Sequence, residues 1–269
     1  MPLAIDKMSL VVTTRCDLKC KLCDEFIPQH KPFADMTLDE ERMLLNALFS
    51  VADYVKLLHL SGGGEPFLHP QLAEMIDIAC EYADKFDELM VFTNSTIAIS
   101  SKLLDAFVRN KEKLIVHCSN YGLMPERSEM LYQTLRENGI KHRITKYYGD
   151  DQDYGGWVDF GDWESRNRTA DELSSIFVNC GITRIMYGNW RTRDGTVHWC
   201  QRSQRGMELG LIPDCPDDYV NLLDDTSIEE KLEKFREIMS TSYLSACNYC
   251  SGNHGTDDKS KRFPAGVQL

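Results

Sequence analysis

Alternating strand-like and helix-like segments run through the first two-thirds of this chain of 269 residues. The strand-like runs are short and mostly apolar, and they cover residues 9–13, 55–60, 88–93, 114–118 and 141–147. Helical patterns lie between them, at residues 37–52, 70–86, 100–108 and 125–138. Thr37 and Glu40 match a capping box at the first helix, and Gly139 is a typical C-cap after the fourth. This alternation predicts an α/β fold with a parallel sheet and crossover helices.

Three cysteines follow the first predicted strand in the run CDLKCKLC, at Cys16, Cys20 and Cys23. Thiolates on one tight loop can hold an iron–sulfur cluster, because Cys sulfur is the soft ligand that iron clusters prefer. A cubane cluster has four irons and this loop offers three thiolates, so one iron would stay open to a small molecule. The alternatives are a zinc loop or buried free cysteines. Zinc sites usually combine a CxxC pair with a second pair of Cys or His, and none follows closely.

A glycine-rich turn follows the second predicted strand and contains Gly63, Gly64, Glu65 and Pro66. Glycine permits positive φ and lets a ligand approach the backbone closely, and the carboxylate could receive a cationic group. An ordinary strand-to-helix turn is the alternative interpretation. Sites in parallel α/β folds form at the carboxyl ends of the strands, so we expect this turn and the cysteine loop at one edge of the sheet.

The two motifs, in this order and some forty residues apart, resemble those of the radical S-adenosylmethionine (radical SAM) enzymes. The resemblance implies a partial (β/α)6 TIM-like barrel in which Cys16, Cys20 and Cys23 hold a [4Fe–4S] cluster. S-adenosylmethionine would bind the open iron, with its amino group at residues 63–66 and its adenine near Leu22. One electron would cleave it to methionine and a 5′-deoxyadenosyl radical, which abstracts a hydrogen atom from carbon.

Polar residues at two further strand ends are candidates for contacts with the ribose and carboxylate of S-adenosylmethionine. They are Thr93 and Asn94 after the third strand, and Ser119 and Asn120 after the fourth. Their alternative role is that of turn residues, which Asn and Ser commonly fill.

Four more cysteines lie in the last third of the chain: Cys180, Cys200, Cys247 and Cys250. Taken alone, they could form a zinc ribbon. Gly195, four residues and then Cys200 resemble the start of the SPASM and twitch extensions of radical SAM enzymes. A full SPASM domain would place a cysteine where this chain has Thr256, so the resemblance is to the shorter twitch domain. It implies one auxiliary [4Fe–4S] cluster without an open iron, acting as an electron relay or a structural staple.

We therefore expect a barrel over residues 1–168, a twitch domain of a β-hairpin and a helix over 169–252, and a polar, partly disordered tail over 253–269. Residues 149–168 are rich in Gly, Asp and aromatic side chains. Residues 157–160 could form a short sixth strand, and the rest is a surface loop or a cap over the substrate pocket. Asp194 and Gly195 predict a hairpin turn between strands at 184–187 and 196–201. A helix is expected at 227–239.

Three cysteines remain outside both sets. Cys80 lies on the apolar face of a predicted helix and is expected in the core. Cys118 or Cys215 could donate a hydrogen atom to a substrate radical, which would make the protein an epimerase. Core packing is the commoner role of a cysteine.

Composition excludes several classes of protein. Forty-two acidic and thirty basic side chains give a net charge of −12, which argues against a nucleic-acid partner. No apolar stretch approaches the length of a membrane helix, and the start of the chain lacks a secretory pattern. Ten cysteines without an export signal indicate metal ligation in a reducing cytoplasm.

The expected activity is dehydrogenation or epimerisation of a sugar or aminocyclitol-like small molecule, with a flavodoxin or ferredoxin as reductant. A peptide substrate is less favoured, because Cys16 stands nearly at the start and leaves no room for a peptide-recognition domain. The alternatives are a peptide maturase, a glycyl-radical activase, or a non-enzymatic iron–sulfur or zinc protein that carries electrons or acts as a scaffold.

Overall fold

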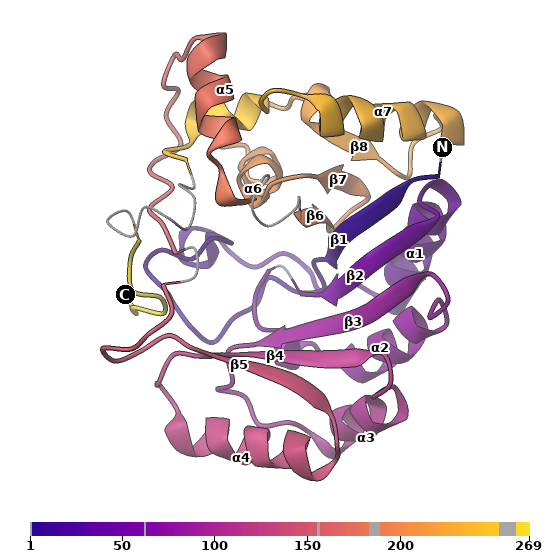
Figure 1. Cartoon of the computed structure of the whole chain (residues 1–269), viewed down its shortest axis with the longest axis vertical. Coiled ribbons are helices and arrows are strands. Elements are labelled where there is room, and N and C mark those ends of the chain that lie inside the picture. Colours follow the sequence, from indigo (N-terminus) through magenta and orange to yellow (C-terminus); the bar gives the residue numbers. More distant parts are fainter. Residues whose placement is uncertain (1, 62, 155–156, 183–188, 253–261) are drawn as a thin grey trace.

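A single sheet organises the computed structural model, which describes residues 2–61, 63–154, 157–182, 189–252 and 262–269 (Figure 1). In these residues the strand order is β5-β4-β3-β2-β1-β6-β7-β8. The strands are β1 (Ala4–Leu10), β2 (Tyr54–Leu60), β3 (Phe86–Thr93), β4 (Leu114–Asn120), β5 (Lys141–Lys146), β6 (Asn189–Thr192), β7 (Thr196–His198) and β8 (Tyr219–Asn221). All pairs from β5 to β6 are parallel, whereas β7 and β8 join antiparallel. The carboxyl ends of six strands therefore share one edge.

The helices follow the predicted alternation. They are α1 (Leu38–Val51), α2 (Leu72–Cys80), α3 (Ser101–Arg109), α4 (Pro125–Glu137), α5 (Ala170–Val178), α6 (Gln201–Glu208) and α7 (Ile228–Ser240), with short 3-10 turns at Ile27–Gln29, Pro66–Leu68, Pro216–Asp218 and Ser245–Tyr249. The capping box at Thr37 and Glu40 is confirmed, and so is the positive φ of Gly139 after α4. The expected helix at 227–239 is confirmed as α7. Helices α5 and α6 were not predicted.

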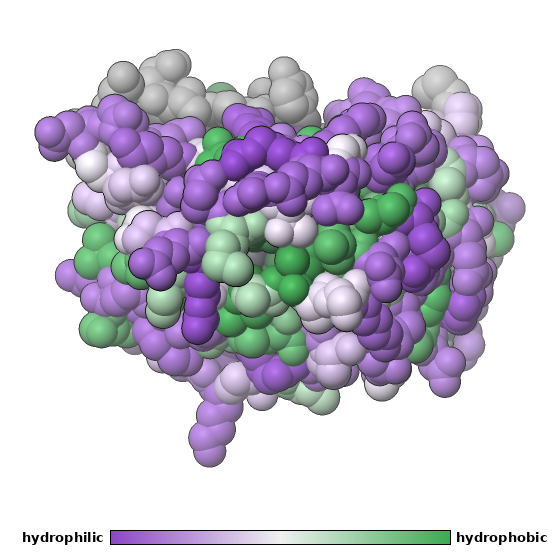
Figure 2. Space-filling model, turned by 90° about the horizontal axis from the view of Figure 1, so that it is seen from below, coloured by the Kyte–Doolittle hydropathy of each residue, from purple (hydrophilic) through white to green (hydrophobic). Residues whose placement is uncertain are grey.

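The main hydrophobic core lies between the sheet and α1–α4, which cover one of its faces (Figure 1). Side chains alternate along each strand, so Leu58 and Leu60 point into this core while His59 points to the other face. Cys80, at the end of α2, packs against the core as expected. The face seen from the side of α4 is mostly hydrophilic around one hydrophobic area (Figure 2).

The predicted sixth strand at residues 157–160 is wrong. That stretch forms no strand, and β6 takes the sixth parallel position on the opposite side of β1. Val158 and Phe160 instead bury their side chains in a small cluster with Phe26. Only Val158 and Phe160 are buried, and Asp159 between them is exposed.

The predicted hairpin about Asp194 and Gly195 is confirmed, with Gly195 at φ +103°. Its first strand is β6 at 189–192; the predicted position at 184–187 lies outside the described residues. Its second strand ends at His198, and α6 begins at Gln201. Strands β6–β8 extend the barrel sheet, so the predicted twitch domain shares a sheet with the barrel. Of the helices that the structure describes, none has the length and apolar character needed to span a membrane.

Candidate metal centres and cofactor site

The CDLKCKLC loop follows the carboxyl end of β1 and places its three cysteines on one stretch of tight turns. Backbone hydrogen bonds from Cys23 N to Cys20 O (3.2 Å) and from Phe26 N to Cys23 O (3.0 Å) close the loop. Cys20 is buried, whereas Cys16 and Cys23 are partly exposed. Burial raises the pKa of Cys16 to about 12. The thiol is therefore neutral in the free protein and would ionise when it binds a metal.

The glycine-rich turn lies directly against this loop. Gly64 N donates to Thr13 O and Glu65 N donates to Arg15 O, both at 2.7 Å. A Cβ atom at Gly63 or Gly64 would collide with the carbonyl oxygens of Thr13 and Arg15, respectively. Only glycine allows this approach. The two motifs, which are distant in sequence, therefore form one unit at the edge of the sheet.

Glu65 is a buried carboxylate at the junction of three strand ends. One of its oxygens accepts from Phe67 N (3.0 Å) and the other from Asn94 N (2.6 Å). Burial raises the pKa of Glu65 to about 7, and the hydrogen bonds counter only part of that rise. In the described part of the chain, no Lys, Arg or His forms an ion pair with this carboxylate. The site can therefore accept a cationic group, as the motif predicts.

Asn94 ties the end of β3 to the cysteine loop. Its side-chain amide donates to Asp17 Oδ1 (2.8 Å) and lies 3.9 Å from the sulfur of Cys16. Thr96 also binds Asp17, through its hydroxyl group. The structure thus brings Asn94 beside Cys16 and Glu65. Asp17 lies there too, although nothing in the spacing of the cysteines indicates a role for it.

The other candidate cofactor residues lie nearby with fewer contacts. Leu22 is partly buried on the loop between Cys20 and Cys23. Ser119 is partly buried near the end of β4. The side-chain oxygen of Asn120 accepts a hydrogen bond from Gly122 N at 3.0 Å. Asn120 therefore acts as a turn residue, which was the alternative to a contact with the cofactor. Pro66 starts the 3-10 turn that follows Glu65.

The four later cysteines, Cys180, Cys200, Cys247 and Cys250, line one small cavity together with apolar side chains that include Phe160, Phe177 and Leu244. We call this space the thiol chamber. Burial raises the pKa of Cys200 to about 12, and the neighbouring Cys180 and Cys250 add to the rise. Among the described residues, no three side chains of His, Cys, Asp or Glu are close enough to hold a single metal ion. The four cysteines share this cavity, and their role as ligands of one cluster stays a prediction.

Two arginines fix the loop that carries Cys247 and Cys250. Arg168 donates to the carbonyl oxygens of Cys247 (2.6 Å) and Cys250 (2.7 Å). Arg202 is 1% exposed, and its guanidinium donates to Tyr249 O and to the carbonyls of residues 161 and 162. It also stacks 3.5 Å from the centre of the Trp163 ring. The chamber is therefore preformed by hydrogen bonds to main-chain atoms.

A buried bridge joins the cysteine loop to the thiol chamber. Phe26, three residues after Cys23, packs edge-on against Trp163 (4.6 Å) and Phe160 (5.9 Å), in a cluster that includes Cys250. Beside it, Glu25 forms a bidentate ion pair with Arg191 of β6, with both contacts at 2.6 Å. Phe26 thus links the cysteine loop to the surroundings of Cys250.

Of the two candidate hydrogen donors, Cys118 lies near the carboxyl end of β4, opposite Thr93, and Cys215 lies outside the parallel strands. Cys118 is fully buried in the main core, on the same side of β4 as Leu114 and Val116. Burial raises its pKa to about 12. Cys215 is partly exposed before β8, which β6 and β7 separate from β1. The location of Cys118 suits core packing, which is the commoner role of a cysteine.

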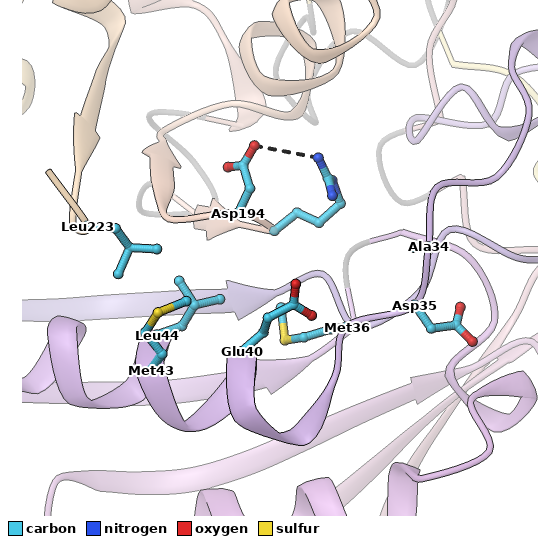
Figure 3. Close-up of a pocket in the computed structure, with 9 residues that line it drawn as sticks. Ala34, Asp35, Met36, Glu40, Met43, Leu44, Asp194 and Leu223 are labelled. Carbon is cyan, nitrogen blue, oxygen red and sulfur yellow. Dashed lines mark hydrogen bonds and ion pairs between the residues drawn. The ribbon is translucent and has the colours of Figure 1, made fainter.

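A further cavity of about 140 Å³ lies between α1, the segment before it and the β6–β7 turn (Figure 3). Asp194 forms an ion pair with Arg193 there. Glu40 caps α1 and Asp35 binds Arg15, so these polar lining groups already have partners. No cysteine lines this cavity.

Comparisons with known proteins bear on the fold. No protein-family model matches the sequence, and no curated protein matches it. Among solved structures, that of BtrN in complex with AdoMet and 2-DOIA is 14% identical, and the match covers 100% of both chains with a TM-score of 0.57. Native anSMEcpe with bound AdoMet is also 14% identical, with a TM-score of 0.57 over 98% of this chain and 93% of that one.

Streptococcus suis SuiB bound to S-adenosylmethionine is 22% identical over 57% of this chain, at a TM-score of 0.44. This chain spans about a third of the length of the SuiB structures that it matches. BtrN and anSMEcpe are radical SAM enzymes, and both align over nearly their whole length. The protein therefore has the α/β, TIM-like fold of the radical SAM enzymes.

Proposed function

We propose that this protein is a radical SAM enzyme that oxidises or epimerises a polar small molecule of the sugar or aminocyclitol class. The observation that carries the proposal is the buried carboxylate of Glu65. It has a raised pKa and no ion-pair partner in the described chain, and it lies near Cys16 at the start of the three-cysteine loop. When bound, a [4Fe–4S] cluster and S-adenosylmethionine supply a 5′-deoxyadenosyl radical that abstracts a hydrogen atom from carbon.

The protein's own residues fit that cofactor pair. Cys16, Cys20 and Cys23 would hold the cluster as thiolates, since iron binding favours the ionised form. Glu65 would receive the ammonium group of S-adenosylmethionine, because a cation stabilises the ionised form of a buried carboxyl. Asn94 fixes the Glu65 carboxylate through its backbone and the cysteine loop through its side chain.

Buried polar side chains on the face of the sheet opposite α1–α4 support a polar substrate. Ser9 donates to Asn189 Oδ1 (3.1 Å), so its oxygen accepts from the Nδ1–H of His59 (3.0 Å). His59 is 5% exposed, and burial lowers its pKa to about 3, which keeps the ring neutral. Its Nε2 is then a buried acceptor without a hydrogen-bond partner. A substrate hydroxyl or ammonium group would satisfy it.

Further support for a small molecule comes from the full-length match with BtrN, whose structure contains AdoMet and 2-DOIA. The thiol chamber suits an auxiliary [4Fe–4S] cluster with four protein ligands, which would accept or return an electron and bind no substrate. An electron acceptor favours oxidation, because a substrate radical must then lose an electron. The burial of Cys118 among core side chains favours a packing role over hydrogen donation.

The activity test is cleavage of S-adenosylmethionine after anaerobic loading with iron and sulfide and reduction by dithionite. We expect methionine and 5′-deoxyadenosine from the wild type, and none after Cys16, Cys20 and Cys23 are replaced together by Ala. Cys80→Ala is the matched control and should retain the activity. Cleavage that persists without the three cysteines would refute the proposal. Zinc in place of iron in the purified protein would favour the scaffold alternative.

The reaction class can be separated in D2O with a panel of aminocyclitols and hexoses. Dehydrogenation predicts an oxidised product that forms in step with 5′-deoxyadenosine and contains no solvent deuterium. Deuterium in an unoxidised product would instead establish epimerisation. Turnover of peptides but of no small molecule would favour the peptide maturase.

A further inference from the structure

A segment from the far end of the sequence pairs with the cysteine loop as a short antiparallel strand. Lys21 N donates to Val267 O (2.7 Å), and Leu269 N donates to Lys19 O (2.9 Å). Cys20 and Gln268 stand opposite each other in this pairing. Two segments almost 250 residues apart therefore meet at the middle cysteine of the triad.

The side chain of Gln268 has a defined orientation. Its Oε1 accepts from Lys19 N at 2.7 Å, which places its amide nitrogen on the other side. That nitrogen donates to Gly266 O at 2.7 Å and to the sulfur of Cys20 at 3.3 Å. If the amide of Gln268 were reversed, its NH2 group would face the N–H of Lys19, and two donors would oppose each other. The hydrogen bond to sulfur thus follows from the whole network.

An aromatic group holds the segment in place from behind. Gly266 has φ +69°, and a Cβ there would collide with the ring of Tyr121. Tyr121 stacks on Tyr147 (5.4 Å) and meets Trp157 edge-on (5.9 Å). The neighbouring Phe263 N donates to Trp157 O at 2.9 Å. The segment therefore has anchors besides the loop itself.

We propose that Gln268 raises the reduction potential of the cluster held by the triad, by donating a hydrogen bond to the ligand sulfur of Cys20. This inference rests on the proposed function, because it needs a cluster at Cys16, Cys20 and Cys23. One-electron reduction adds negative charge that the sulfurs share, so a donor on sulfur stabilises the reduced form more than the oxidised form. Gln268 acts through Cys20 and is a positioning residue.

The test is a potentiometric titration followed by EPR, using the signal that changes when S-adenosylmethionine is added. In Gln268→Leu, which keeps a side chain of similar bulk without a donor, we expect about a tenfold lower ratio of reduced to oxidised cluster at a fixed potential. For one electron that corresponds to a midpoint about 59 mV lower. Gln133→Leu, a glutamine that donates to Glu137 on the exposed side of α4, is the control and should not shift the midpoint.

An unchanged midpoint in Gln268→Leu, with normal iron content and S-adenosylmethionine binding, would overturn this inference and leave the proposed function standing. A wild-type protein that binds no cluster would instead refute the proposed function. Should Gln268→Leu fail to load iron, Gln268→Glu decides the matter. Its carboxylate adds charge near sulfur and should lower the midpoint further, and a midpoint equal to or above that of the wild type would contradict the proposal.

Discussion

The two sets of cysteines differ in the polarity of the side chains around their sulfur atoms. The triad lies on an irregular loop that is partly exposed and touched by amide donors from Asn94 and Gln268. The thiol chamber is lined mostly by apolar side chains, and two arginines bind main-chain carbonyls of the loop that carries Cys247 and Cys250. A polar setting suits a group that receives a ligand, whereas an apolar one suits a group that only exchanges electrons.

The largest expected effect separates the two sets by removing each in turn. We expect about eight iron atoms per loaded chain, and about four after either the triad or the pair Cys247 and Cys250 is replaced by Ala. The triad variant should lose all S-adenosylmethionine cleavage. The chamber variant should retain cleavage of S-adenosylmethionine but lose product formation. Iron assays measure the iron content, and chromatography of 5′-deoxyadenosine measures the cleavage. An equal loss of cleavage in the two variants would contradict the different roles of the triad and the thiol chamber.

Arg202→Met tests whether the chamber depends on its arginine clamp. The substitution removes the hydrogen-bond donor of the carbonyls of Gly161, Asp162 and Tyr249 and leaves them unpaired. This should lower the free energy of unfolding by about 2–4 kcal/mol. Urea unfolding measures this. Arg166→Met removes a more exposed pair with Asp162 and should cost less than about 1 kcal/mol. If both variants lose the same small amount, the clamp does not hold the chamber.

Glu65→Gln tests the cation site beside the triad, through both affinity and pH. The pKa of Glu65 is raised to about 7, so the carboxylate becomes protonated as the pH falls through that value. Affinity for S-adenosylmethionine should therefore fall by up to about tenfold per pH unit below it. Glu65→Gln should bind about tenfold more weakly at high pH and lose the pH dependence. Equilibrium dialysis between about pH 6 and pH 8 would show a flat wild-type profile if Glu65 played no part.

Phe26→Leu tests the bridge between the two sets and has the smallest expected effect. Loss of its contacts with Phe160 and Trp163 should cost about 1–2 kcal/mol of unfolding free energy. Phe263 is 40% exposed, so Phe263→Leu should change stability by at most about 0.5 kcal/mol. A Phe26 variant as stable as the Phe263 variant would show that the bridge contributes no packing energy.

Local patterns in the sequence predicted much of the fold because they depend on neighbouring residues. Capping residues such as Thr37 and the apolar runs located the first five strands and four helices. The cysteine spacing and residues 63–66 placed the site at the carboxyl edge of the sheet, where the structure has it. These features need no knowledge of distant contacts.

What the sequence did not predict depends on contacts between distant segments. Strand β6 has only four residues, and its position next to β1 follows from pairing that no local pattern records. The pair of Glu25 with Arg191 and the contact of Gln268 with Cys20 are likewise invisible in either segment alone. Residues 157–160 resemble a strand because buried Val158 and Phe160 alternate with exposed Asp159, and a loop can bury the same side chains as a sheet.

The most direct test of the central distinction is EPR of the reduced protein with and without S-adenosylmethionine, in the two variants that each keep one set of cysteines. The variant with only the triad should show a spectrum that changes when S-adenosylmethionine is added. The variant with only the thiol chamber should show a cluster signal that does not change. A change in the chamber variant, or none in the triad variant, would contradict the assignment of the open site to Cys16, Cys20 and Cys23.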